Sequence, residues 1–441
     1  MYIKKLKKEM TECRIIQVSK VLHKKESHST VKYNQLIKQK LGLVKGQNVI
    51  NLYLKITENC NFDCVFCSQN CEDTKNKIDF DKAKYILDQA KNLGFINIYY
   101  TGGEPLLNKD LCKIVEYGRS LGFNQCIITN GYLLDKNVNI LEYIDKIGIS
   151  LHGDKDTYEL IVQRKNVYEK IISNIELVRA KNIPININYT TCEHNSNVKQ
   201  LQYVANFCKD KKLEMTVARL NYIGKASRTD QQDVNTICKY INQLNNKGYD
   251  IKLSNCLIPC VVEDKYRYLC HGCGAAISTI AIDSLGNVSI CASSKRIEGN
   301  VFKSNLKTIL KKIKSAELKR LNSLPTCCKI CKYMPLCKGG CKIEVKDGYS
   351  CDYLLNRKYD VFTRSILNKF VVLKLDKIII NEKQIILPFP LRILDKKYYN
   401  FIKELDGSKK VRTVIEGVEN KDELMQLLFC LNEDNYLIIK E

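Results

Sequence analysis

Three cysteines, Cys60, Cys64 and Cys67, stand in a C-x3-C-x2-C spacing directly after the alternating apolar run Val49–Ile56. Three thiolates in such a spacing can hold three irons of a [4Fe–4S] cluster and leave the fourth iron open to a small bidentate ligand. We expect the chemistry of the protein to take place at that open iron. A zinc-binding loop that uses Cys64 and Cys67 is the alternative interpretation.

A second motif, Gly102-Gly103-Glu104-Pro105, follows the next apolar run. Glycines let backbone groups approach a ligand closely, and a carboxylate can pair with an ammonium group. Parallel sheets bind their ligands at the carboxyl ends of the strands. Because both motifs directly follow strand-like runs, we expect them to share one ligand site.

The elements that position these motifs alternate between apolar, strand-like runs and stretches with helical spacing. The helical stretch after the first run, for example, places Ala83, Ile86, Leu87, Ala90 and Leu93 on one face. Six such βα units predict an α/β fold with a parallel sheet and helices on its outside. The six runs are Val49–Thr57, Ile96–Tyr100, Gln125–Thr129, Lys146–Leu151, Pro184–Thr190 and Glu214–Ala218.

Length and composition narrow the class of protein. A chain of 441 residues should hold two or three domains. No stretch approaches the ~18 uninterrupted apolar residues of a membrane helix, and the N-terminus lacks the apolar core of a secretory signal. We therefore expect a cytoplasmic protein without a membrane partner. In that compartment thiols stay reduced, so the 22 cysteines favour metal or cluster ligation over disulfides.

The net charge of +23 suggests an acidic partner. The lysines are scattered, and no Arg-rich block with interleaved aromatic residues suggests a nucleic-acid track. We expect a basic N-terminal segment of unknown role (1–48), the βα units (49–250), a Cys-rich segment (251–360) and a small α+β domain (361–441). In the last segment, short alternating runs and helices follow the order of a winged helix.

The cysteine triplet, with Asn59, Phe62 and Phe66 around it, resembles the signature of the radical S-adenosylmethionine (SAM) superfamily. This resemblance implies a partial (β/α)6 barrel of TIM-barrel type whose cluster binds SAM through its methionine amino and carboxylate groups. It implies that an electron from the cluster cleaves SAM to a 5′-deoxyadenosyl radical, which takes a hydrogen atom from an inert C–H position.

The same resemblance implies SAM contacts for Gly102, Gly103, Glu104, Ser150, Arg164 and Phe66. It places the segment Gly102–Pro105 at the methionyl amine, and Ser150 and Arg164 at positions that contact the ribose and the carboxylate. His152 is a candidate proton-transfer group, with a partly exposed loop histidine as the alternative interpretation.

The second cysteine field resembles the SPASM extension, which in its full form holds two auxiliary [4Fe–4S] clusters. The resemblance assigns Cys273, Cys291 and Cys341 to the first cluster and Cys328, Cys331, Cys337 and Cys351 to the second. The first cluster needs a fourth ligand. Cys270 is our choice because it forms a CxxC pair with Cys273; Cys260 and Cys256 compete with it, as Cys327 does with Cys328. A pair of zinc sites is the alternative.

Ala292 stands where sulfatase-maturing relatives carry an Asp that serves as a base, which counts against that activity. The C-terminal segment loosely resembles a small peptide-recognition domain, in which a leader peptide adds as an edge strand. A generic winged helix is the alternative.

Together these features predict a radical SAM/SPASM enzyme, an oxidoreductase with three [4Fe–4S] clusters. We expect it to install a thioether or carbon–carbon crosslink in a ribosomally made precursor peptide with a leader. An electron donor such as a flavodoxin or ferredoxin is then required. The alternatives are sulfatase-type protein maturation, a small metabolite such as a tetrapyrrole as substrate, or a non-catalytic metal protein that binds nucleic acid.

Overall fold

The computed structural model of the chain describes residues 50–69, 76–221, 223–226, 233–324, 328, 333–343, 362, 365–373, 379–380, 384–388, 391–395, 398–416, 418, 420–433 and 436–440. The basic segment 1–48 lies outside the described residues, so its role stays open.

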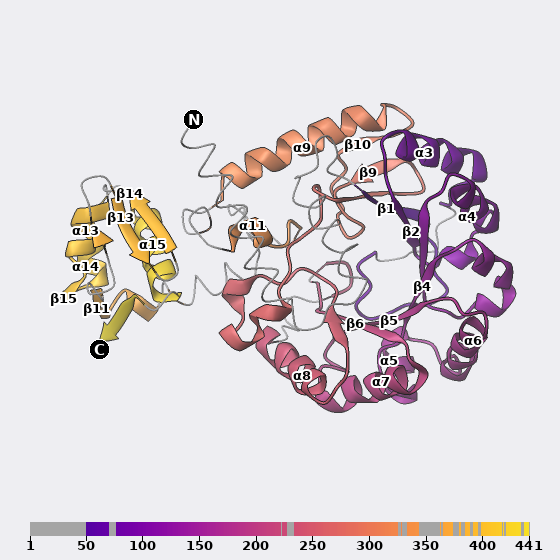
Figure 1. Cartoon of the computed structure of the whole chain (residues 1–441), viewed down its shortest axis with the longest axis horizontal. Coiled ribbons are helices and arrows are strands. Elements are labelled where there is room, and N and C mark those ends of the chain that lie inside the picture. Colours follow the sequence, from indigo (N-terminus) through magenta and orange to yellow (C-terminus); the bar gives the residue numbers. More distant parts are fainter. Residues whose placement is uncertain are drawn as a thin grey trace. The chain divides into compact units, whose positions relative to one another are not determined.

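The main sheet has ten strands in the order β10-β9-β8-β1-β2-β3-β4-β5-β6-β7. From β8 through β1 to β7 all neighbours pair in parallel, and β9 and β10 add antiparallel at the β8 edge. The expected α/β partial barrel is confirmed, and all six predicted runs form strands (Figure 1). Those six are β1 (Asn51–Thr57), β2 (Asn97–Gly102), β3 (Asn124–Thr129), β4 (Lys146–Ser150), β5 (Ile185–Thr190) and β6 (Glu214–Ala218).

Helices cover the outside of this curved sheet (Figure 1). In β1 every second residue is apolar and buried: Leu52, Leu54 and Ile56 join a core with Ile86 and Leu87 of α3. Asp and Asn side chains cap four of the helices by accepting hydrogen bonds from first-turn amides. The helices are α3 (Phe80–Asn92), α4 (Leu111–Ser120), α5 (Lys155–Val162), α6 (Tyr168–Ala180), α7 (Val198–Lys211) and α8 (Val234–Asn246), with 3-10 turns η1 (Pro105–Leu107), η2 (Leu134–Lys136) and η3 (Val138–Glu142).

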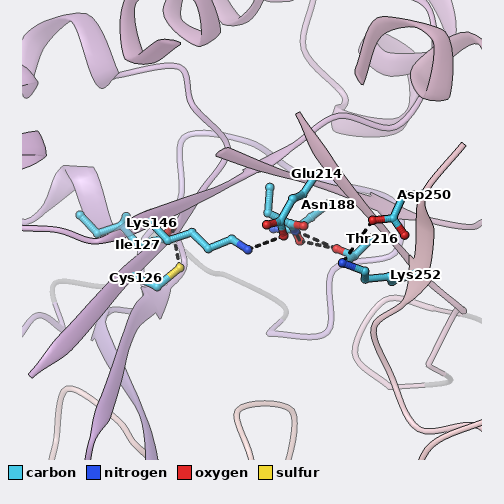
Figure 2. A network of polar contacts seen from close by, with 9 residues as sticks. Cys126, Ile127, Lys146, Asn188, Glu214, Thr216, Asp250 and Lys252 are labelled. Carbon is cyan, nitrogen blue, oxygen red and sulfur yellow. Dashed lines mark hydrogen bonds and ion pairs between the residues drawn. The ribbon is translucent and has the colours of Figure 1, made fainter. Parts of the chain in front are cut away.

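The alternate strand residues face the inside of the barrel and are largely polar. Figure 2 shows part of this face, where Lys146 of β4 reaches across β5 to Glu214 of β6, with 2.6 Å between Nζ and Oε2. Farther along the same face Thr216 donates to Asn188 Oδ1 at 3.0 Å. The inner face therefore offers hydrogen-bonding groups rather than a packed apolar filling.

The Cys-rich segment contributes to the same sheet. Its strand β8 pairs in parallel with β1, and the pattern of apolar residues alone did not predict this pairing. The elements here are β7 (Ile251–Leu253), η4 (Pro259–Val261), η5 (Asp264–Leu269), β8 (Thr279–Ile282), β9 (Asn287–Ser289), β10 (Gly299–Asn300), α9 (Leu306–Asn322) and α11 (Met334–Cys337).

The C-terminal segment forms two small antiparallel sheets, in the orders β15-β11-β16 and β12-β13-β14. Its core includes Ile402, Leu428 and Leu431. The elements are β11 (Phe370–Leu373), β12 (Ile379–Ile380), β13 (Gln384–Pro388), β14 (Leu391–Asp395), α13 (Tyr399–Lys403), β15 (Asp406–Lys410), α14 (Val411–Ile415), α15 (Lys421–Glu433) and β16 (Leu437–Lys440). Across the described ranges, no helix combines the length and the apolar character that crossing a membrane requires.

Candidate active site

The first cysteine triplet lies in the loop that leaves the carboxyl end of β1. Backbone hydrogen bonds from Asp63 to Val162 (3.3 Å) and from Val65 to Ile161 (3.0 Å) fasten this loop to the end of α5. None of the three cysteines is in a disulfide, and each residue as a whole is partly exposed although the Cys64 thiol itself is largely enclosed. Burial, followed by the nearby Cys60 and Cys67 thiols, raises the pKa of the Cys64 thiol far above its usual range. The three thiols thus lie within electrostatic reach of one another.

The two glycines of the second motif lie against the backbone of the cysteine loop. A Cβ at Gly103 would lie 2.0 Å from the carbonyl oxygen of Asn59, and one at Gly102 would lie 2.2 Å from that of Thr57. The Gly103 amide donates to the Thr57 carbonyl and the Glu104 amide donates to the Asn59 carbonyl, each at 2.8 Å. Among the described residues, what the glycines approach closely is therefore the cysteine loop itself.

The carboxylate of Glu104 is buried, with 1% of the residue exposed. It accepts hydrogen bonds from Thr129 Oγ1 (2.6 Å) and from the amides of Asn130 (2.8 Å) and Leu106 (3.1 Å). Burial outweighs these donors and raises the pKa of Glu104 to about 7. Glu104 thus ties the ends of β2 and β3 together beneath the cysteine loop.

The other predicted SAM-contacting residues lie around the same loop. Arg164 donates to the carbonyl of Asn61 at 2.7 Å, and its guanidinium lies 4.8 Å from the ring centre of Tyr132. Ser150 is the last residue of β4 and is partly exposed. Phe66, between two of the cysteines, packs edge-on against His152 with 5.0 Å between ring centres. The predicted set therefore lies at the carboxyl ends of β1, β2 and β4, except for Arg164, which follows α5 and reaches the cysteine loop through Asn61.

His152 is not a partly exposed loop residue, so that interpretation is wrong. Only 3% of it is exposed, and its Nδ1 accepts a hydrogen bond from the amide of Thr190 at 3.1 Å. Burial lowers the pKa of His152 to about 3. It is a neutral core histidine that supports Phe66 from behind.

In the second cysteine field, Cys273, Cys291 and Cys341 lie near one buried lysine or near one another. Burial raises the pKa of the Cys291 thiol, and the nearby Cys273 thiol raises it further. Lys342, directly after Cys341, is within electrostatic reach of Cys273 and pairs with Glu317 at 2.9 Å. Cys273 thus lies within electrostatic reach of both Cys291 and the lysine that follows Cys341.

Cys270 has different neighbours. Burial raises the pKa of its thiol to about 12, and the next contributions come from Cys238, Arg267 and Cys337. A Cβ at Gly272 would lie 1.9 Å from the carbonyl oxygen of Leu336. The CxxC segment Cys270–Cys273 therefore packs against the backbone beside Cys337. Sequence reasoning missed Gly272, although a glycine inside a CxxC spacing was a visible signal.

Not all predicted ligands can be placed. Cys331 and Cys351 lie outside the described residues, as does the competitor Cys327. Cys328 and Cys337 are described and partly exposed, and Cys256 and Cys260 lie near the same apolar cluster as Cys337. Within the described ranges, no three His, Cys, Asp or Glu side chains lie close enough to hold a single metal ion. A four-iron cluster spans more space than one ion does.

The cysteine loop fits an iron–sulfur cluster in its donor set and its surroundings. Three cysteine thiols outside any disulfide supply the ligands that such clusters use. The Asn61 Nδ2 group, next to Cys60, is buried and has no hydrogen-bond partner among the described residues. A buried donor without a partner usually indicates a bound group that completes its hydrogen bonding.

The Ala292 position, where a catalytic Asp is absent, adjoins the triplet. Gln69 donates to the Ala292 carbonyl at 3.0 Å and accepts from Lys55 Nζ at 2.8 Å. Lys55 is also close enough to Cys291 to lower its pKa, against the larger effect of burial. Lys55 and Gln69 thus connect the first cysteine loop to the second field.

Comparison with known proteins identifies the domain. Residues 54–207 match the family model described as the Radical SAM superfamily. Fe-coproporphyrin III synthase of Methanosarcina barkeri is 24% identical over 44% of this chain and 52% of its own length. PqqA peptide cyclase of Gluconobacter oxydans is 29% identical over 34% of this chain and 44% of its own. The chain thus spans about half the length of these relatives.

The fold also matches SuiB of Streptococcus suis bound to precursor peptide SuiA. The TM-score is 0.59 at 17% identity, over 75% of this chain and 80% of the other. SuiB bound to S-adenosylmethionine gives a TM-score of 0.60 at 18% identity, over 79% and 87%. These likenesses extend well beyond the residues that match the family.

Proposed function

Because this chain is an enzyme of the radical SAM superfamily with a SPASM-type fold, we propose that it modifies a ribosomally made precursor peptide by forming a thioether or carbon–carbon crosslink. The observation that carries the proposal is the fold likeness to SuiB in its complex with a precursor peptide, which covers 75% of this chain. The name of PqqA peptide cyclase also points to peptide cyclisation. A non-catalytic metal protein is excluded.

In this proposal Cys60, Cys64 and Cys67 hold the catalytic cluster. Gly102, Gly103, Glu104, Ser150, Arg164 and Phe66 hold SAM beside it, as a set on neighbouring strand ends. When bound, the cluster and SAM supply a 5′-deoxyadenosyl radical that takes a hydrogen atom from the peptide. The residues of this chain orient SAM and keep water away from the radical.

The second cysteine field supplies auxiliary clusters in the proposal. Cys273, Cys291 and Cys341 hold the first, with Cys270 as the fourth ligand, and Cys328, Cys331, Cys337 and Cys351 hold the second. Such clusters can accept an electron from a substrate radical, and hydrogen bonds and burial tune their potentials. Cys270 lies beside Cys337, which is assigned to the second cluster, so the fourth ligand of the first cluster is the first assignment to test. The test compares the iron content of Cys270→Ala, Cys260→Ala and Cys256→Ala.

The C-terminal sheet β15-β11-β16 offers the docking site for the leader peptide. Both β15 and β16 are edge strands of this sheet within the described residues. Ile438 and Ile439 of β16 are 44% and 43% exposed, which is unusual for isoleucines on an edge strand. Lys440 follows them and favours an acidic leader. An added peptide strand would cover these side chains and pair with the edge.

The decisive experiment measures SAM cleavage by anaerobically reconstituted protein. With SAM and dithionite the wild type should form 5′-deoxyadenosine, and Cys64→Ala should form none. About twelve irons per chain are expected if all three clusters have the four-iron composition. Formation of 5′-deoxyadenosine by Cys64→Ala at the wild-type rate would refute the proposal.

A small metabolite is the second candidate substrate, because the first relative is named for an iron–porphyrin product. Replacing Ile438 and Ile439 with Glu places charge on the exposed β16 edge without disturbing the core. In our proposal this double variant loses peptide modification and keeps uncoupled SAM cleavage. A metabolite enzyme would keep its full activity. The electron donor in the cell, a flavodoxin or ferredoxin in this proposal, can be identified by replacing dithionite with each.

A further inference from the structure

Tyr158 is a fully buried tyrosine in α5, the helix whose end fastens the cysteine loop. It is 0% exposed, and its ring lies between those of His152 (6.0 Å between centres) and Tyr168 (5.9 Å). The ring is therefore fixed by packing on both sides. Because α5 also accepts the Asp63 and Val65 amides, Tyr158 and the cysteine loop are held in one unit.

The hydroxyl of Tyr158 has no hydrogen-bond partner among the described residues. Other tyrosines nearby or in the same core have one: Tyr189 donates to the Asn195 carbonyl at 2.6 Å, and Tyr100 donates to Gln125 Oε1 at 2.5 Å. Leaving a buried hydroxyl without a partner costs about 1–3 kcal/mol. An unpaired hydroxyl inside a rigid core therefore indicates a partner that is not part of the described chain.

The surroundings of the hydroxyl indicate where that partner binds. Burial is the largest cause that raises the pKa of the Tyr158 hydroxyl. The next causes, in order of size, are the nearby Cys64, Glu104 and Cys60 side chains. The carboxylate of Glu104 already accepts three hydrogen bonds from other donors. The other two neighbours, Cys64 and Cys60, both belong to the cysteine loop.

We propose that the Tyr158 hydroxyl donates a hydrogen bond to a sulfur atom of the iron–sulfur cluster held by Cys60, Cys64 and Cys67. This inference rests on the proposed function of that loop. A donor to a cluster sulfur stabilises the reduced, more negative state, so it raises the reduction potential. Tyr158 is thus a positioning residue that sets how readily the cluster accepts its electron.

The test compares Tyr158→Phe with Tyr189→Phe as a matched control. Both residues are fully buried and both lie beside His152, but the Tyr189 hydroxyl has a protein partner. The reduction potential of the reconstituted cluster is measured without SAM, by redox titration followed by electron paramagnetic resonance. In Tyr158→Phe the ratio of reduced to oxidised cluster at a fixed potential should fall about tenfold, which is about 59 mV for one electron. Tyr189→Phe should match the wild type.

Stability of the cluster-free protein gives a second readout. Without the cluster, Tyr158→Phe removes a hydroxyl that has no partner, so it should unfold at the same denaturant concentration as the wild type or a higher one. Tyr189→Phe should unfold at a lower one. An unchanged potential in Tyr158→Phe, or a loss of cluster-free stability equal to that of Tyr189→Phe, overturns the inference. So does an unchanged potential with weaker SAM binding, since the partner would then be SAM.

These outcomes are separable from failure of the proposed function. If the wild type itself binds no cluster, the proposed function fails and takes the inference with it. If the wild type binds a cluster and cleaves SAM while Tyr158→Phe behaves like Tyr189→Phe, only the inference fails.

Discussion

The two cysteine regions of this chain are built in different ways. The first, residues 57–69, follows one strand and is held by backbone hydrogen bonds to the end of α5 and to the glycine motif after β2. The second spreads its described cysteines, between residues 256 and 341, over several short strands, 3-10 turns, helices and loops, and a buried charged cluster around Lys342 helps to hold it. The first ligand set therefore depends on the geometry of one strand end, whereas the second depends on how several separate segments pack together.

The largest effect is expected from Gly103→Ala in the first region. Its Cβ would lie 2.0 Å from the Asn59 carbonyl, which is backbone and cannot move aside alone. The cysteine loop should be displaced, so that the protein loses the iron of its catalytic cluster and all 5′-deoxyadenosine formation. Iron analysis and a SAM cleavage assay measure this.

Gly248→Ala is the control for that change. Nothing lies within 4 Å of a Cβ at Gly248, so only its positive φ of 83° is strained, at a cost of about 1–2 kcal/mol. It should keep iron and activity. Full activity in Gly103→Ala would show that the close approach of the two loops is not needed.

Gly272→Ala applies the same steric overlap to the second region, where the Cβ would lie 1.9 Å from the Leu336 carbonyl. It should lower the auxiliary iron content while about four irons and uncoupled SAM cleavage remain. Electron paramagnetic resonance of the reduced protein separates the clusters. Loss of SAM cleavage together with the auxiliary iron would mean that the two regions do not function independently.

This contrast also explains what the sequence alone could predict. The run Glu214–Ala218 forms a strand with those same bounds, because strict alternation on a sheet with one apolar face leaves little choice. The triplet and Gly102–Gly103 were recognisable because one strand end positions each. The three-residue strand β7 and the β8–β1 pairing were not, since such short runs carry no period and the pairing joins residues far apart in the chain.

The His152 prediction failed for a related reason. Its neighbours Leu151 and Gly153 give no sign of burial, and what encloses the ring comes from three other segments: Phe66, Tyr158 and Tyr189. The position of Cys270 beside Cys337 is likewise set by Gly272 and a distant helix. Packing between remote segments decides both, and spacing within one segment does not report it.

A smaller effect is expected from Lys342→Met, which tests the charged cluster of the second region. Lys342 is 1% exposed in its side chain and pairs with Glu317, which also accepts from Arg320 at 3.0 Å. Removing the lysine leaves Glu317 only partly compensated, so the free energy of unfolding should fall by about 2–3 kcal/mol. Denaturant unfolding of the cluster-free protein measures this change.

Lys409→Met is the matched control, because Lys409 and Glu404 also form an ion pair at 2.6 Å but are about half exposed. Exposed pairs contribute little, so the free energy of unfolding should stay close to that of the wild type. Equal effects of the two substitutions would mean that the second region is not held by its buried charges.

The smallest effect is a pH dependence that originates in the packing behind the first region. The pKa of His152 is lowered to about 3 in the folded protein, so between pH 6.5 and 3 the unfolded chain binds the proton more readily. The stability that neutral His152 provides is therefore complete above pH 6.5 and is lost as the pH falls, by about 2 kcal/mol between pH 6.5 and 4.5. His152→Asn keeps an acceptor for the Thr190 amide, so its cluster-free unfolding curve should depend less on pH than that of the wild type. Equal slopes in the two proteins would show that acid does not act on the first region through this histidine.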